Sequence, residues 1–158
     1  MGHLNKFTKF VMNIKRKNMN LEAIREYLVD HDIRPLKKRI KIMEYLIRKR
    51  NHPTVDMIYS DLIREIPSLS KTTVYNVLKL FVQKGVAISL TIEGNEVRFD
   101  ADVRLHGHFK CNVCGGVFDF SVGNSKEIFP GLDGFIIEES HVYLKGICSF
   151  CQSKHLYH

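Results

Sequence analysis

Two pairs of cysteines in the second half of the chain have a spacing suited to metal binding. Cys111 and Cys114 stand in CNVC, Cys148 and Cys151 stand in CSFC, and 33 residues separate the pairs. Two intervening residues let both thiolates of a pair face one tetrahedral ion, so two such pairs complete a four-sulfur Zn²⁺ site. Because protein fills all four positions, we expect this zinc to stabilise the fold rather than to catalyse a reaction.

Three other uses of the cysteines are less consistent with the sequence. Disulfides are typical of secreted proteins, and the chain begins without a recognisable secretory signal. A thioredoxin-like redox pair needs a βαβ pattern around it, which is absent here. An iron–sulfur centre stays open as a less favoured alternative.

Histidines and carboxylates near the first cysteine pair form a second group of metal donors. His106 and His108 alternate with Gly107, so both imidazoles lie on one face of an extended strand, an arrangement common for first-row metals. Asp119 follows the first cysteine pair, and Asp100 lies six residues before His106. His52 lies far away in NHPT, and in isolation it does not predict a ligand.

Capping residues and apolar spacing predict four helices that precede these donors. Asn20, Thr54 and Ser70 are suitable N-caps for the first, third and fourth helices, and Pro35 suits the first turn of the second, over 35–50. We expect the third helix to end at Ile66-Pro67, and the fourth to end at Gly85. The apolar stripes are Leu21, Ile24 and Leu28; Ile40, Met43 and Ile47; Met57, Ile58 and Leu62; Val74, Leu78 and Phe81.

The apolar period then changes from 3.6 to 2 residues. AISLTI and EVRFD flank Gly94-Asn95, which predicts a β-hairpin after the helices and therefore a winged helix. Short strands are expected around residues 110–122 and 134–148, with a short helix near 125–129. The prediction is an α+β protein with three parts: a basic N-terminal extension (1–19), a winged-helix DNA-binding domain (20–100), and a small α/β dimerisation and metal-binding domain (101–158).

The charge distribution and the fourth helix indicate double-stranded DNA as a partner. Residues 1–100 hold 19 Lys and Arg against 11 Asp and Glu, whereas residues 101–158 hold 5 against 6. A helix-turn-helix reads the major groove with short polar side chains of its second helix, here the helix after PSLS. The candidate DNA-binding residues opposite its apolar stripe are Lys71, Thr72, Tyr75, Asn76 and Lys79. One such module reads few base pairs, so a homodimer on a palindromic operator is expected.

Membrane attachment is not predicted. No apolar run approaches the roughly 18–20 residues that span a bilayer. Lys6 stands where a myristoylation signal needs Ser or Thr. We therefore expect a cytoplasmic protein.

Taken together and in order, these motifs resemble the ferric uptake regulator (Fur) family of metal-dependent bacterial repressors. The resemblance covers about residues 20–152 and rests on these segments: NHPTVDMIYSDL, PSLSKTTVYNVLKLF, RFD, HGHFKCNVCG and CSFC. It implies a winged-helix domain, a dimerisation domain with a four-cysteine zinc site, and a regulatory metal at the hinge. The implied regulatory ligands, for Fe²⁺ or Mn²⁺, are His52, Asp100, His106, His108 and Asp119. Because these ligands come from both domains, the metal would fix the placement of the DNA readers.

Asp119 decides between branches of the family, since iron-sensing members usually carry Glu there and peroxide-sensing (PerR) members carry Asp. The resemblance is therefore closest to the peroxide-sensing branch, in which Fe²⁺ and hydrogen peroxide oxidise His52 or His106 and release DNA. An iron-responsive regulator is the alternative within the family. A redox protein or a zinc-ribbon enzyme that uses Cys-x-x-Cys is a distant alternative. The favoured prediction is a regulator that is not an enzyme.

The sequence departs from the family pattern at three places. RPLKKR replaces the usual Thr-x-Gln-Arg pattern, Leu105 and Gly107 stand where iron sensors often have His and Asp, and the N-terminal extension is unusually long. His141 is either a remnant of an additional metal site or an ordinary strand histidine.

Overall fold

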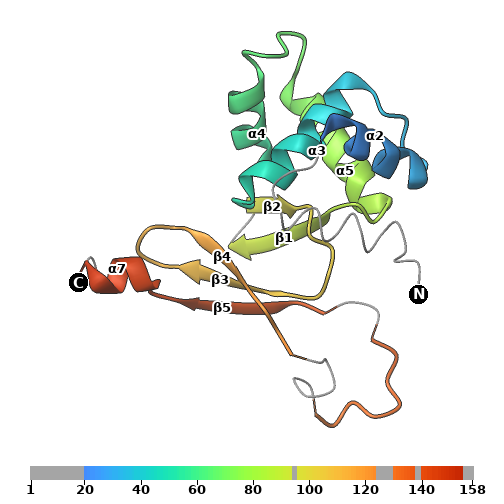
Figure 1. The fold of residues 1–158 in the computed structure, drawn as a ribbon. Coiled ribbons are helices and arrows are strands. Elements are labelled where there is room, and N and C mark those ends of the chain that lie inside the picture. The colour runs from blue at the N-terminus through green and yellow to red at the C-terminus, as the bar shows by residue number, and fades with distance from the viewer. Residues whose placement is uncertain (1–19, 94–95, 124–129, 138–139, 155–158) are drawn as a thin grey trace. The chain divides into compact units, whose positions relative to one another are not determined.

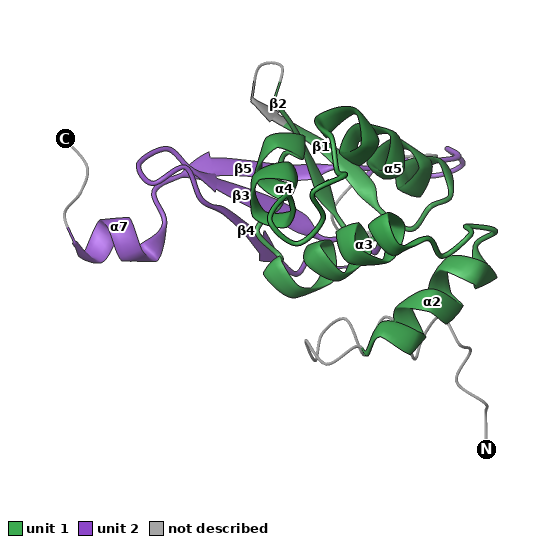
Figure 2. Ribbon diagram, turned by 90° about the horizontal axis from the view of Figure 1, so that it is seen from above, with its two compact units in different colours: residues 1–103 green, residues 104–158 purple. Residues whose placement is uncertain are grey.

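The computed structural model describes residues 20–93, 96–123, 130–137 and 140–154. The chain forms two compact units, divided between Val103 and Arg104 and coloured separately in Figure 2. Among the described residues, unit 1 carries four helices and a two-stranded sheet, and unit 2 carries a three-stranded sheet and a short helix (Figure 1). Within the described ranges, no helix has both the length and the apolar character needed to cross a membrane.

Three of the four helices of unit 1 begin at the predicted caps. These helices are α2 (Leu21–Asp30), α4 (Val55–Leu62) and α5 (Lys71–Gln83). The side-chain oxygens of Asn20, Thr54 and Ser70 accept the backbone N–H of the third residue onward, at 2.9, 3.2 and 3.1 Å. Just after α5, Gly85 adopts φ +66°, which a glycine tolerates at little cost.

The remaining helix, α3 (Lys37–Lys49), differs from the prediction. Pro35 was expected in its first turn but lies two residues before it, and Leu36 is the N-cap without a side-chain hydrogen bond. Leu36 has extended backbone angles, so the helix starts two residues later than the proline suggested. The prediction for α4 was also too long, because its C-cap is Ile63 and residues 63–65 form a turn.

One hydrophobic core fills unit 1. Every helix contributes fully buried side chains, and α3 lies among the others with buried residues along most of its length. The largest fully buried side chains are Phe81, Ile24, Leu28, Ile33, Ile42, Met43, Leu46, Ile47, Ile58, Leu78, Val74 and Val86. The core therefore fixes the polar face of α5 outward.

The predicted hairpin is confirmed by β1 (Ile88–Glu93) and β2 (Glu96–Asp100). The strands pair antiparallel with Ile88 opposite Asp100, and the register shifts between Thr91 and Glu93. The expected turn residues Gly94 and Asn95 lie outside the described residues. With the helices, this ribbon completes the winged-helix outline of unit 1.

Unit 2 is built on the strand order β4-β3-β5. Strand β3 (Gly107–Cys111) pairs antiparallel with β4 (Val117–Phe120) and parallel with β5 (Val142–Gly146), and α7 (Ser149–Ser153) follows. The strand predicted within 134–148 is β5, which covers only the later part of that segment, since residues 134–137 are not in a strand. The expected helix near 125–129 lies outside the described residues.

Unit 2 has little aliphatic core among its described residues. Its buried cluster consists of Cys111, Cys148 and Cys151 with Phe109 packed against them. A small unit with so few buried aliphatic side chains gains much of its stability from a staple such as a metal ion.

Candidate metal centres and nucleic-acid interface

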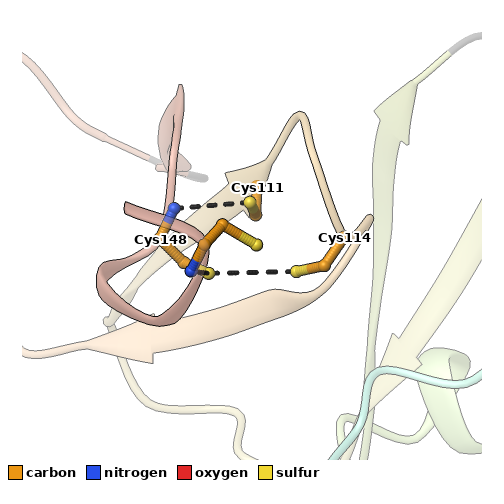
Figure 3. A group of neighbouring side chains, drawn as sticks. Cys111, Cys114 and Cys148 are labelled. Carbon is orange, nitrogen blue, oxygen red and sulfur yellow. Dashed lines mark hydrogen bonds between the residues drawn. The ribbon is translucent and has the colours of Figure 1, made fainter. Parts of the chain in front are cut away.

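The structure brings all four cysteines together in unit 2. Cys111 ends β3, Cys114 lies in the following turn, and Cys148 and Cys151 lie at the start of α7. Their four sulfur atoms all lie within 4.8 Å of one another, and no disulfide joins them. The Cys114 and Cys148 sulfurs are 3.9 Å apart (Figure 3), close to the roughly 3.8 Å that a tetrahedral zinc with Zn–S bonds of about 2.3 Å requires. The arrangement is compatible with a closed zinc site.

The backbone around the cysteines favours thiolates at some positions and not at others. Backbone N–H groups, first that of Cys114 and then that of Cys148, lower the pKa of Cys111 to about 6. The Cys148 N–H lies 3.3 Å from the Cys111 sulfur (Figure 3). Burial instead raises the pKa of Cys151 to about 12. A bound dication would therefore compensate the negative charge of the Cys151 thiolate, which burial alone disfavours.

Lys110 stabilises the turn that carries the first cysteine pair. Its side chain is buried, and Nζ donates a 2.8 Å hydrogen bond to the Gly115 carbonyl. Gly115 has φ +70°, a conformation suited to glycine at the end of the CNVC turn. The Cys111 N–H also donates to the Gly116 carbonyl, so two consecutive residues of β3 close the turn.

Three of the predicted regulatory ligands lie together on one face of the unit 2 sheet. His108 faces Asp119 directly across the β3–β4 pair. The Nε2 atoms of His106 and His108 lie 3.7 and 3.8 Å from Oδ1 of Asp119. Metal–ligand bonds of roughly 2.0–2.2 Å allow two donors of one ion to be about 4 Å apart, so these three atoms fit a shared ion.

The tautomer of His106 also suits a ligand. Its Nδ1 lies 2.7 Å from the Arg104 carbonyl, which can only accept, so in the neutral ring Nδ1 carries the proton. Nε2 then presents its lone pair towards Asp119. Between the two histidines, a Cβ at Gly107 would overlap the Phe120 ring, so no larger residue fits at this position unless Phe120 moves.

The other two predicted ligands lie together in unit 1. His52 precedes α4 and Asp100 ends β2; both are buried, and His52 Nε2 lies 3.4 Å from Asp100 Oδ2. Oδ1 of Asp100 accepts the N–H of Asp102 at 2.9 Å, which orients the carboxylate. Imidazole and carboxylate donors in both units match the ligand preferences of Fe²⁺ and Mn²⁺.

Sequence reasoning missed Arg98, which contacts the backbone beside a predicted ligand. Its Nη1 donates to the carbonyl of His52 at 3.0 Å. A contact between a side chain and a backbone group 46 positions away leaves no periodic or compositional signal in the sequence.

The five predicted DNA-binding residues lie on the exposed side of α5. Val74, Leu78 and Phe81 are buried on the opposite side, and Tyr75 has 52% of its surface exposed. Lys71, Thr72, Asn76 and Lys79 are exposed as well. The turn before α5 is held by Lys38, whose Nζ donates to the Ser68 carbonyl at 2.6 Å.

Lys71 differs from the others because it is already paired. Its Nζ lies 2.5 Å from Asp56 Oδ1 on α4, and that carboxylate raises the pKa of Lys71. A DNA phosphate would therefore have to compete with the Asp56 carboxylate for Lys71, the first residue of α5.

Known proteins resemble the chain in both sequence and structure. The ferric uptake regulator family model matches residues 30–143. A peroxide-responsive repressor PerR of Staphylococcus aureus is 34% identical over 125 residues, which cover 77% of this chain and 84% of that protein.

Solved structures give the same result. The Vibrio cholerae ferric uptake regulator superposes with a TM-score of 0.65 at 28% identity, over 78% of this chain and 98% of that one. The Helicobacter pylori regulator, at 19% identity, shares the fold with a TM-score of 0.66 over 85% of this chain and 95% of that one. Members of this family are dimeric, DNA-binding transcriptional regulators and not enzymes. The chain belongs to the ferric uptake regulator family and is a metal-responsive transcriptional repressor.

Proposed function

We propose that this repressor responds to hydrogen peroxide. The observation that carries the proposal is Asp119, which lies across from His108 in the β3–β4 pair and approaches the Nε2 atoms of His106 and His108. Aspartate at this position is the feature by which the sequence resembles the peroxide-sensing branch. The similarity to a peroxide-responsive repressor over 77% of the chain supports the same assignment.

Two metals with different tasks follow from the two donor sets. Cys111, Cys114, Cys148 and Cys151 hold structural Zn²⁺, whose closed sulfur shell leaves no position for a reactant. The regulatory ion is Fe²⁺ or Mn²⁺, held by His52 and Asp100 of unit 1 and by His106, His108 and Asp119 of unit 2. These five residues would offer five nitrogen and oxygen donors, which would leave such an ion able to bind a small molecule as well.

Fe²⁺ held by these residues would provide the redox chemistry that cleaves the O–O bond of hydrogen peroxide. In the net reaction one oxygen atom enters a ring C–H bond of His52 or His106, the imidazole loses two electrons, and the other oxygen atom leaves as water. The oxidised ring no longer offers the same donor, so the link between the two units is lost. Peroxide is coupled to DNA release if the metal binds the DNA-binding state of the protein more tightly than the state that has released DNA.

We further propose that the exposed face of α5 reads a palindromic operator as a homodimer. Asn76 has the side chain that pairs with adenine, and Lys79 suits a phosphate. Unit 2 exposes large apolar side chains that a second copy would cover. These side chains are Phe118, Leu132, Phe135, Ile136, Ile137, Leu144 and Phe150.

Mass spectrometry tests the peroxide assignment. The protein is loaded with Fe²⁺ without oxygen, exposed to hydrogen peroxide and digested. We expect one added oxygen atom on the peptide of His52 or His106, together with loss of operator binding, and neither change with Mn²⁺ loading. The His108→Ala variant should lose metal-activated DNA binding and keep its zinc. Unmodified histidines in a protein that stays bound to DNA would support the iron-responsive alternative instead.

A further inference from the structure

The loop that carries His52 is fastened to the outer edge of β2. Arg98 Nη1 donates to the His52 carbonyl at 3.0 Å, and the Phe99 N–H donates to the Pro53 carbonyl at 3.1 Å. Two consecutive carbonyls of the loop are therefore bound by two consecutive residues of the strand.

The backbone of this loop needs such support. His52 has φ +47°, in the left-handed region that residues with a Cβ seldom adopt. This conformation costs free energy and persists only where the surrounding structure holds it. The hydrogen bond from Arg98 acts on the peptide of His52 itself.

The guanidinium of Arg98 is in turn fixed by a carboxylate. Its Nε and Nη2 lie 3.1 and 3.0 Å from Oε2 of Glu96, and the third nitrogen serves the His52 carbonyl. A planar guanidinium held through two nitrogens directs the third, so the position of the donor is set. The Arg98 side chain is only 14% exposed, whereas that of Glu96 is 50% exposed.

Strand β2 therefore carries both Arg98, which holds the His52 backbone, and Asp100, whose carboxylate lies beside the His52 imidazole. Arg98 and Asp100 are two residues apart, so their side chains leave the strand on the same side. Asp100 Oδ2 reaches the imidazole of His52 at 3.4 Å, and Arg98 reaches its backbone. Strand β2 therefore contacts His52 at both its side chain and its backbone.

We propose that Arg98 is a positioning residue for the regulatory metal: it holds the His52 backbone so that the imidazole stays beside Asp100. The proposal rests on the proposed function, because it takes His52 as a ligand. Groups that orient a metal ligand commonly change metal affinity about 10- to 100-fold when they are removed. Arg98 itself contributes no ligand, since a guanidinium remains protonated and has no acceptor.

The experiment measures the Mn²⁺ dissociation constant of the zinc-loaded protein by electron paramagnetic resonance of free Mn²⁺. We expect Arg98→Met, which keeps the length of the side chain without donors, to weaken binding about tenfold or more. Arg98→Lys keeps one charged donor and should recover part of the loss. The matched control is Arg25→Met, the same substitution at an exposed arginine of α2 that pairs with Glu22 at 3.9 Å, and it should bind Mn²⁺ as the wild type does.

A purely structural role for Arg98 would lower the unfolding midpoint without a specific loss of Mn²⁺ affinity in the folded protein. Wild-type affinity in R98M, or equal loss in R98M and R25M, would overturn the proposal. If R98M does not fold, Arg98→Gln decides by the same comparison. His52→Ala separates the proposed metal site from the proposed role of Arg98. Wild-type Mn²⁺ binding in H52A contradicts the metal site. Weak binding in H52A with normal binding in R98M contradicts only the role of Arg98.

Discussion

Asp56 on α4 and Lys71 on α5 form an ion pair, with 2.5 Å between Nζ and Oδ1, at the entrance of the helix expected to read DNA. Both side chains are mostly exposed, so the pair is accessible to a competing phosphate. The carboxylate also places a negative charge beside the expected path of the DNA backbone.

Replacing Asp56 by Asn should therefore strengthen operator binding. The freed Lys71 can neutralise one more phosphate, which would steepen the dependence of log K on log salt by about 0.9. Fluorescence anisotropy of metal-loaded protein at several salt concentrations measures both quantities. Asp32→Asn is the control for net charge, because Asp32 pairs with Lys84, and neither residue is among the expected DNA contacts. Equal effects of the two variants would mean that only overall charge matters.

The parts of the fold that were predicted correctly depend on local chemistry. Asn20, Thr54 and Ser70 cap helices because their side-chain oxygens satisfy N–H groups three residues away, and that spacing is visible in the sequence. The cysteine cluster and the His106–His108 face follow in the same way from the geometry of a turn and a strand. The start of α3 was predicted wrongly from Pro35, because a proline fits both the first turn of a helix and the residues before it.

The contacts that could not be predicted join side chains to distant backbone groups. Arg98 to His52, and Lys38 to Ser68, are hydrogen bonds to carbonyls 46 and 30 residues away. Any residue type offers a carbonyl, so the acceptor leaves no mark in the sequence. The left-handed conformation of His52 is equally hidden, because the residue is neither Gly nor Asn.

Helix α3 offers a site for stabilisation at its N-terminus. Leu36 is the N-cap without a side-chain acceptor, and no acidic residue lies in the first turn. The Leu36→Ser variant should be more stable than Leu36→Ala by about 1 kcal/mol, since a serine hydroxyl can accept an N–H of the first turn. The two variants remove the same exposed apolar side chain and differ by one oxygen. Urea unfolding followed by circular dichroism measures the difference, and equal midpoints would show that the cap does not form.

Tyr45 makes the stability of unit 1 sensitive to alkaline pH. Burial, and next the hydrogen bond to Asp61 at 2.8 Å, raise the pKa of Tyr45 to about 12. In the unfolded chain the phenol ionises near pH 10. The contribution of the neutral phenol is therefore complete below pH 10 and is lost as the pH rises from about 10 to 12.

Tyr45→Phe should make this decline less steep without abolishing it, because burial also raises the pKa of Tyr27 in the same core. Below pH 10 it should lower stability slightly, through loss of one hydrogen bond worth about 1 kcal/mol. Because the chain has no tryptophan, unfolding in urea at pH 9, 10 and 11 is followed by circular dichroism. Tyr75→Phe, on the exposed face of α5, is the control and should decline as the wild type does. The same steep decline in Y45F would assign the sensitivity to another group.

Cys148 allows the effect of zinc to be separated from the capping of α7. Its sulfur accepts the Cys151 N–H at 3.5 Å, and serine is a favourable N-cap, so Cys148→Ser keeps a cap but removes a thiolate. We expect this variant to lose zinc and to leave unit 2 unprotected from amide hydrogen exchange, because the described residues of that unit include few other buried hydrophobic side chains. Unit 1 has its own core and should keep its protection. Ser153→Ala, in the same helix, is the control and should retain one zinc per chain. Retained zinc and protection in C148S would contradict the structural zinc site.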